Sequence, residues 1–156
     1  MYPQRYIPKI LTRKDRKKQL FMLNKSKKMY KQKKYYTRKK VASFPHKTSK
    51  HILKARRIYK IDSIVPSPEL ARKTGCSIGA LQEIVRKGEG AYYSSGSRPN
   101  QNAQSWGLAR LASSVTGGNS SAVDFSILEN GCHHKKTAYK LAKKSQNILL
   151  SSHNIT

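Results

Sequence analysis

The chain has 156 residues, of which 33 are Lys or Arg and only 7 are Asp or Glu, so its formal net charge is +26. Repulsion at this charge opposes a compact free monomer and attracts nucleic acid, acidic proteins or anionic lipid. Hydrophobic residues make up 37% of the chain. Because an average globular domain has roughly 45–50%, part of the chain is expected to lie outside a core. No stretch approaches the roughly 18 consecutive apolar residues of a membrane-spanning helix.

The charge divides near residue 60. Residues 1–60 hold 22 basic side chains and a single acid, Asp15, whereas residues 61–156 hold 11 basic and 6 acidic side chains. This asymmetry predicts a basic arm at 1–60 that becomes ordered only with partners, a small helical domain at 61–144 and a C-terminal tail at 145–156. The predicted fold class is mainly α, with a helix-turn-helix-like pair preceded by a long extended or helical arm.

The arm combines many lysines with tyrosines. From Thr12 to Lys40 it has the residue types of a helix but few apolar anchors, and like charges three and four residues apart repel. Lysines can contact phosphates while tyrosine rings stack on bases or pack beneath a partner; the alternative is a solvated tail that serves solubility. The predicted polyanion- or partner-binding residues are Arg13, Lys14, Arg16, Lys17, Lys18, Lys25, Lys27, Lys28, Lys31, Lys33, Lys34, Arg38, Lys39, Lys40, Tyr30, Tyr35 and Tyr36.

Two short helices are expected at the start of the domain. Ser67 and Pro68 are typical of a helix start, and this helix is expected to stop at Gly75. Ser77 then caps a second helix that ends near Lys87. Ala71, Gly75, Leu81 and Ile84 have the spacing of a helix-turn-helix unit. The exposed face of the second helix offers Ser77, Gly79, Gln82 and Glu83, which favours a structural pair over a DNA reader.

Residues 88–106 are rich in Gly, Ser, Pro and Asn and are expected to form a loop. Arg98 can hold a carboxylate or phosphate there, or it can cap the carbonyls of the loop itself. The residues of this candidate loop site are Tyr92, Tyr93, Arg98 and Trp106. Later helices are expected at 106–115, capped by Asn102 or Ser105, and at 135–144, with a short turn or helix at 124–129 between them.

Metal and catalytic chemistry find little support in the sequence. Cys132, His133 and His134 are adjacent, and adjacent ligands rarely converge on one zinc ion, so neither a metal nor a cofactor is expected. Two cysteines are too few for a disulfide framework, and no secretory segment opens the chain, so a reducing compartment is expected. No nucleotide-binding loop, zinc-protease motif or nucleophile elbow is present. We therefore expect no enzyme; an enzyme would have to use the loop around Arg98.

Part of the domain resembles an uncharacterised domain family of large double-stranded DNA viruses, including those of algae and amoebae, and some phages. The likeness runs from about Ala71 to Asp124, about a third of the chain, and leaves the arm outside. It is carried by Gly75-Cys76, Leu81, Gly88, the run from Gly90 to Gln101, Ser105-Trp106, Ala109 to Ala112, Thr116 to Gly118 and Asp124. The resemblance implies a viral protein but supplies no activity and no catalytic residue.

Charge and resemblance together lead to one functional expectation. The chain is expected to be a minor capsid protein that bridges capsid subunits and the particle interior through its polycationic arm, made in the host cytoplasm and located in the virion. Its expected partners are capsid proteins, with nucleic acid or an anionic inner membrane surface as further contacts and no small-molecule substrate. The alternative is a soluble, sequence-nonspecific nucleic-acid-binding protein for genome packaging or regulation.

Overall fold

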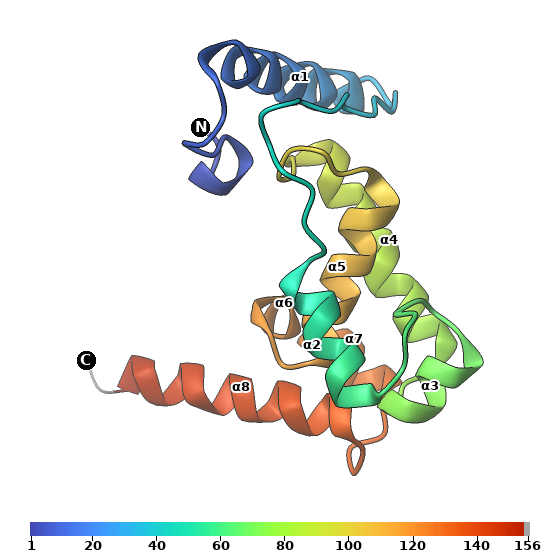
Figure 1. Cartoon of the computed structure of the whole chain (residues 1–156). Helices are drawn as coiled ribbons and strands as arrows, with labels where there is room; N and C mark the ends of the chain where they lie inside the picture. The colour runs from blue at the N-terminus through green and yellow to red at the C-terminus, as the bar shows by residue number, and fades with distance from the viewer. Residues whose placement is uncertain (155–156) are drawn as a thin grey trace. The chain divides into compact units, whose positions relative to one another are not determined.

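The computed structural model describes residues 1–154, with side chains through residue 151. All of its regular elements within this range are helices, which confirms the predicted mainly α class (Figure 1). They are the 3-10 helix η1 (Gln4–Tyr6), α1 (Arg13–Lys31), α2 (Lys50–Tyr59), α3 (Pro68–Thr74), α4 (Ile78–Ser94), α5 (Ala103–Val115), α6 (Asn119–Val123), α7 (Phe125–Gly131) and α8 (Thr137–Asn154). No helix in the described range is both long and apolar enough to cross a membrane.

The chain divides into two compact units. Unit 1 contains residues 1–47 and 87–107, and unit 2 contains residues 48–86 and 108 onward. Helices α4 and α5 therefore contribute residues to both units. The boundary between the units does not fall at residue 60. Helix α2 belongs to unit 2, whereas residues 1–47, here called the basic segment, form unit 1 together with residues 87–107.

Helix α1 is long and strongly basic, and its two ends are well defined. The Thr12 side chain accepts a hydrogen bond from the Asp15 amide and caps the start. At the end, the Lys34 amide donates to the Met29 carbonyl (2.9 Å) and the Lys33 amide to the Tyr30 carbonyl (2.9 Å). With Lys33 in the left-handed region (φ 61°), these two bonds form a Schellman motif that reverses the chain.

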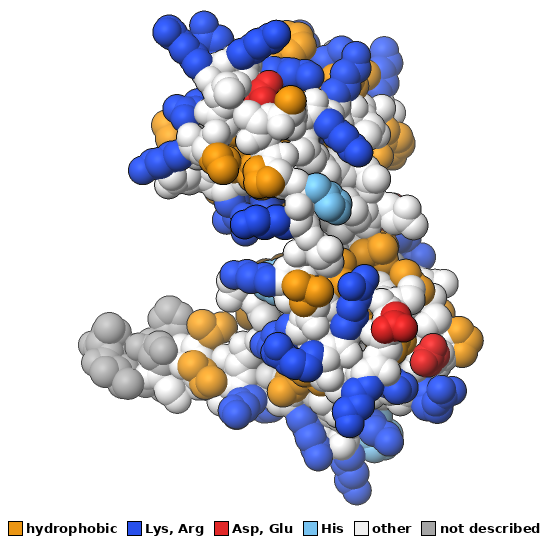
Figure 2. Space-filling model, in the orientation of Figure 1, with side chains coloured by type: hydrophobic (Ala, Val, Ile, Leu, Met, Phe, Trp, Pro, Cys, Tyr) orange, Lys and Arg blue, Asp and Glu red, His pale blue; other side chains and the backbone are white. Residues whose placement is uncertain are grey.

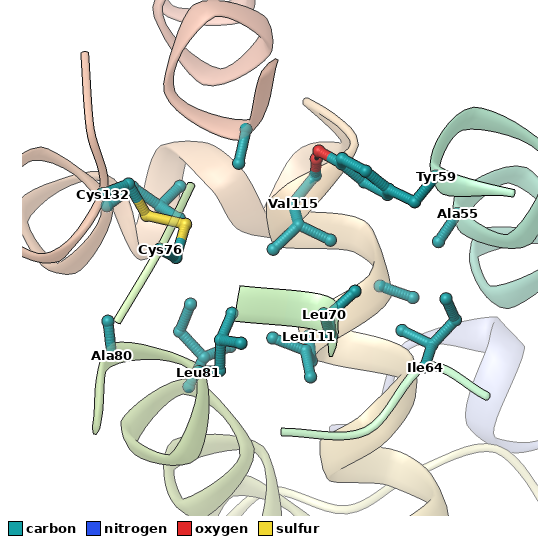
Figure 3. Close-up of a cluster of buried hydrophobic side chains, with 14 of the residues drawn as sticks. Ala55, Tyr59, Ile64, Leu70, Cys76, Ala80, Leu81, Leu111, Val115 and Cys132 are labelled. Carbon is teal, nitrogen blue, oxygen red and sulfur yellow. Dashed lines mark hydrogen bonds between the residues drawn. A yellow bond between two sulfur atoms is a disulfide. The ribbon is translucent and has the colours of Figure 1, made fainter. Parts of the chain in front are cut away.

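Unit 2 is built around one hydrophobic cluster, part of which Figure 3 shows. Ala55 from α2, Leu81 from α4 and Leu111 from α5 are fully buried there. The Tyr59 hydroxyl donates to the Val115 carbonyl, and burial raises the pKa of that phenol. The segment predicted as part of an arm therefore supplies core residues to unit 2.

The predicted pair of helices is confirmed as α3 and α4. The Ser67 side chain accepts from the Leu70 amide, Pro68 opens α3, and Gly75 ends it with φ +81°. A side chain on Gly75 would also collide with Lys136, whose Cβ would lie 2.3 Å from the added carbon. Left-handed backbone and close approach both require glycine at this turn.

Cys76 and Cys132 form a disulfide, which the sequence did not predict (Figure 3). The expectation of two reduced thiols is therefore wrong for this structure. Two backbone hydrogen bonds hold the segments side by side, from the Ser77 amide to the Gly131 carbonyl (2.8 Å) and from the His133 amide to the Gly75 carbonyl (2.8 Å). The two cysteines are 56 positions apart in sequence, and nothing in that spacing could reveal their proximity.

Two predicted helix ends are wrong. Helix α4 does not stop near Lys87 but continues to Ser94, and α8 does not stop at residue 144 but continues to Asn154. In α4, each helical glycine costs only about 1 kcal/mol, which the burial of Tyr92 offsets. In α8, neither Gly nor Pro follows residue 137 to end the helix. Asn102 caps α5 as expected, since its side chain accepts from the Ser105 amide at 2.7 Å.

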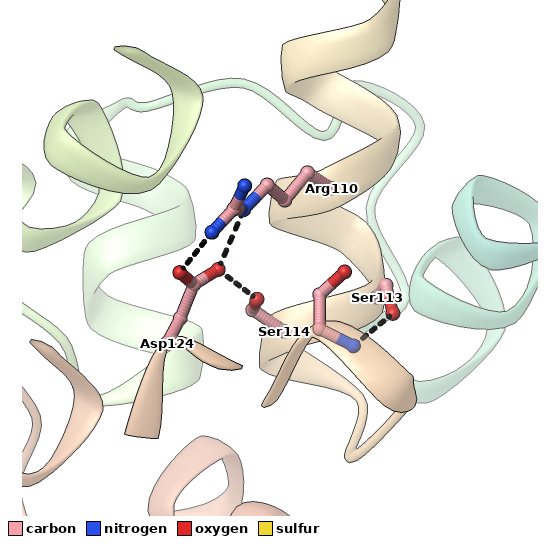
Figure 4. A network of polar contacts seen from close by, with 5 residues as sticks. Arg110, Ser113, Ser114 and Asp124 are labelled. Carbon is pink, nitrogen blue, oxygen red and sulfur yellow. Dashed lines mark hydrogen bonds and ion pairs between the residues drawn. The ribbon is translucent and has the colours of Figure 1, made fainter. Parts of the chain in front are cut away.

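A buried ion pair joins α5 to the turn before α7 (Figure 4). Arg110 donates to both carboxylate oxygens of Asp124, at 2.6 and 3.0 Å. The Ser114 hydroxyl donates a third hydrogen bond to the same carboxylate at 2.8 Å. Asp124 is completely buried, so this network neutralises a charge that would otherwise be costly inside unit 2.

Candidate polyanion-binding surface

The strongest charge lies on unit 1, which carries 19 basic side chains against the two acids Asp15 and Glu89, a net +17. Helix α1 buries one stripe, formed by Gln19, Met22, Leu23 and Ser26. These positions share one helical face, so the nine Lys and Arg residues of α1 occupy the remaining surface, where all are exposed. Figure 2 shows Lys and Arg side chains gathered around this helix.

Most of the predicted binding residues lie on this surface. Of the basic residues predicted to contact a polyanion, all are exposed except Arg38. Tyr30 and Tyr35 are exposed and Tyr36 is half-buried. Arg38 is only 6% exposed, so it contacts the interior of unit 1 and cannot meet an external phosphate.

Arg38 is held entirely by neutral groups. Its guanidinium donates to the Ser26 hydroxyl (2.8 Å), the Tyr92 carbonyl (2.9 Å) and the Ser97 hydroxyl (2.8 Å), and it lies over the Tyr92 ring at 3.8 Å. The Tyr92 hydroxyl accepts from the Arg38 amide at 2.9 Å. Burial lowers the pKa of Arg38, opposed mainly by Tyr92, and no carboxylate among the described residues forms an ion pair with it.

The end of α4 and the loop after it, residues 92–100, here called the clamp loop, hold residues 41–44 in place. The Asn100 side chain accepts from the Val41 amide (2.7 Å) and donates to the carbonyls of Val41 (3.2 Å) and Phe44 (3.0 Å). Gly96 has φ +114°, and a side chain there would lie 3.0 Å from Leu23 Cδ2. The glycine therefore allows the clamp loop to contact α1 closely.

Asp15, in the first turn of α1, holds Ser43 against that helix. Its carboxylate accepts from the Ser43 hydroxyl (2.6 Å) and from the Ser43 amide (2.9 Å), while the Ser43 hydroxyl accepts from the Thr12 amide (3.0 Å). The hydrogen bond from the Ser43 side chain is the main cause that lowers the pKa of Asp15. Asp15, the single acid of residues 1–60, therefore holds the chain at Ser43 against the start of α1.

The four residues of the predicted loop site do not converge on a common pocket. Tyr92 is fully buried beneath Arg38, Trp106 meets the Tyr6 ring edge-on at 6.0 Å, and Tyr93 contacts the Tyr35 ring at 5.0 Å. Only Arg98 among them is exposed. Three of the four pack against residues 1–47, so the loop works as a structural clamp within unit 1.

Sequence reasoning missed the hydrogen-bonding partners of the clamp. Ser26, Ser43, Ser97 and Asn100 are short polar residues, and such residues are common at any protein surface. One signal was available for Ser43. Asp15 is the single acid among the 22 cations of residues 1–60, so its carboxylate could be expected to have a specific partner, and that partner is Ser43.

Two hollows on the surface lie in unit 2, one along α8 beside His134 and Lys140 and another beside the start of α4. In the part of the chain that the structure describes, no three His, Cys, Asp or Glu side chains gather to hold a metal ion.

Comparison with known proteins gives one result. No curated protein and no solved structure matches the chain. One family model, described as a family of unknown function (DUF5824), matches residues 3–127. The match covers most of the basic residues up to residue 60 together with the helices as far as α7. The chain is a member of the DUF5824 family.

Proposed function

We propose that this protein is a non-catalytic nucleic-acid-binding protein that holds the phosphate backbone on the basic surface of unit 1. The observation that carries the proposal is the separation of α1 into a buried stripe and a surface of nine exposed cations. Seven of the nine are Lys, which contacts phosphate as a point charge, whereas base edges are read by planar, bidentate groups. The binding is therefore independent of base sequence.

The packing of the basic segment supports a folded surface more than a threaded tail. Arg38, Val41 and Ser43 are fixed by the clamp loop and by Asp15, while the lysines of α1 are exposed. A helix of 19 residues is about 28 Å long. Duplex DNA presents about one phosphate for each 1.7 Å of its axis, so α1 is long enough to meet several phosphates at once.

The test measures binding of a short DNA to the free protein across a salt series. If six cations each neutralise a phosphate, affinity falls roughly 10³-fold between 50 and 200 mM salt. The variant K17Q/K28Q/K31Q removes three exposed α1 lysines and should reduce the slope of log K against log salt by about 2.7.

The matched control is K54Q/R72Q/K135Q, which removes three exposed charges from unit 2. The control should leave the slope unchanged. Equal loss in both triple variants would show that net charge alone attracts DNA, and the proposed surface would then be wrong.

A second function, the minor capsid protein of a large double-stranded DNA virus, is supported by a different observation. Leu149 and Leu150 of α8 are exposed beyond Lys140, Lys143 and Lys144, a combination that suits docking against an acidic protein surface. The resemblance of the clamp loop to viral domains supports the same setting. The capsid role predicts weak DNA binding by the free protein, rescued by capsid protein, and cross-links from α8 to capsid subunits.

A further inference from the structure

Three tyrosines from distant parts of the sequence form an exposed cluster on unit 1. The Tyr35 ring lies 6.2 Å from that of Tyr30 and 5.0 Å from that of Tyr93. Tyr35 is 70% exposed and Tyr30 37% exposed, so the cluster presents ring surface to the solvent. This grouping joins the basic segment to the clamp loop.

The local fold holds the cluster in place. The Schellman motif after α1 turns the chain at Lys33 and returns Tyr35 towards Tyr30. Tyr93 is held in place by the fully buried Tyr92, since the two rings meet edge-on at 5.1 Å. Because Tyr35 packs against a ring that is held in this way, it loses little conformational freedom when a base stacks on it.

Exposed lysines lie next to the cluster residues in the sequence. Lys31, Lys33 and Lys34 are exposed and lie in sequence between Tyr30 and Tyr35. Exposed aromatic rings bordered by cations are the two components of a surface that binds single strands, since lysines follow the backbone while rings stack on bases. In a duplex the base faces are already stacked on each other, so only unpaired bases can lie on the tyrosines.

We infer that Tyr30, Tyr35 and Tyr93 form a stacking platform for unpaired bases, so that unit 1 prefers single-stranded nucleic acid to a duplex. This inference rests on the proposed function and adds the kind of strand that is bound. Single-stranded DNA and RNA offer the same stacking chemistry and the same phosphates. The platform tolerates any base, because every base has a π face.

The test compares four probes by fluorescence anisotropy or competition: oligo(dT), oligo(U), a duplex of the same length, and inorganic polyphosphate, which has no bases. Y35A should weaken binding of both single strands by roughly 5- to 100-fold and leave the duplex and polyphosphate unchanged. Y35F keeps the ring and should retain nearly full affinity. The matched control is F21A, which removes another exposed aromatic side chain of unit 1, 66% exposed on α1; it should bind all four probes as the wild type does.

The outcomes separate the platform from the proposed function. If the wild type binds all four probes alike and Y35A changes none of them, the platform is overturned while backbone binding stands. Equal losses in Y35A and F21A, or a Y35A loss on polyphosphate, also overturn it. If the wild type binds no probe, the proposed function fails and the platform with it. A loss in Y35A on both oligo(dT) and oligo(U), with the duplex and polyphosphate unchanged, supports stacking, and the strand that binds the wild type more tightly shows which of the two sources unit 1 favours.

Discussion

Replacing Arg38 with Met should release residues 1–47 from the clamp loop while unit 2 stays folded. The guanidinium is the centre of the clamp, since it donates to Ser26, to Ser97 and to the Tyr92 carbonyl. Met has a similar length and fills the space, but it donates no hydrogen bond. The Tyr92 carbonyl would then be left buried without its partner.

The magnitude follows from these contacts. A buried carbonyl that loses its donor costs about 1–3 kcal/mol. The lost stacking of the cation on the Tyr92 ring, 3.8 Å away, costs about 1–2 kcal/mol. The two serine hydroxyls have other acceptors, the Tyr36 and Arg98 carbonyls, so they add less. A loss of about 3 kcal/mol raises the population of the opened segment on the order of 100-fold.

Limited trypsin digestion measures this population. Residues 1–47 contain many Lys and Arg residues, and trypsin cleaves the peptide bonds that follow them only after local opening. R38M should be cut in this segment on the order of 100-fold faster than the wild type, and R98M, which changes the exposed neighbour, should not. If wild type and R38M are digested equally fast, the clamp does not hold the segment in the free protein. That result would favour the expectation of an arm ordered only with partners.

Three further predictions concern stability. Gly96→Ala places a side chain at φ +114° and should destabilise unit 1 by about 1–3 kcal/mol; an unchanged melting temperature would contradict the close approach. Reducing the Cys76–Cys132 disulfide, which spans 56 residues, should cost about 4 kcal/mol and lower the melting temperature in dithiothreitol, whereas C76S/C132S should not respond to dithiothreitol. Because the folded pKa of Asp15 lies below its unfolded value, its contribution is complete above about pH 4 and lost as the pH falls through the folded pKa. The stability difference between wild type and D15N should therefore vanish in acid, and a difference that does not change with pH would exclude a role for the charge.

The sequence was most informative where local signals are strong. Ser67, Pro68 and Gly75 correctly predicted both ends of α3, because helix caps and left-handed turns depend on only a few adjacent residues. It was misleading between residues 88 and 94, where glycines suggested a loop but the burial of Tyr92 maintains the helix. Local propensity is a weak guide wherever tertiary packing contributes more than about 1 kcal/mol per residue.

The candidate surface was predictable in part, for a physical reason. Exposed lysines need no partner in the fold, so their identity alone predicted them. The buried role of Arg38 and the contact of Tyr35 with Tyr93 depend on residues far away in sequence, and a single sequence carries no record of such contacts. For the same reason the disulfide and the clamp loop could be found only in three dimensions.

The way unit 1 is held together links its stability to its proposed ligand. With two acids against 19 cations, ion pairs cannot balance its charge, and the clamp uses carbonyls, hydroxyls and aromatic rings instead. These neutral groups satisfy hydrogen bonds but leave the net charge of +17 in place, so repulsion between the lysines continues to oppose folding. A bound phosphate backbone removes that repulsion and stabilises the folded unit by linkage. Folding of the basic segment and binding of a polyanion are therefore expected to strengthen each other.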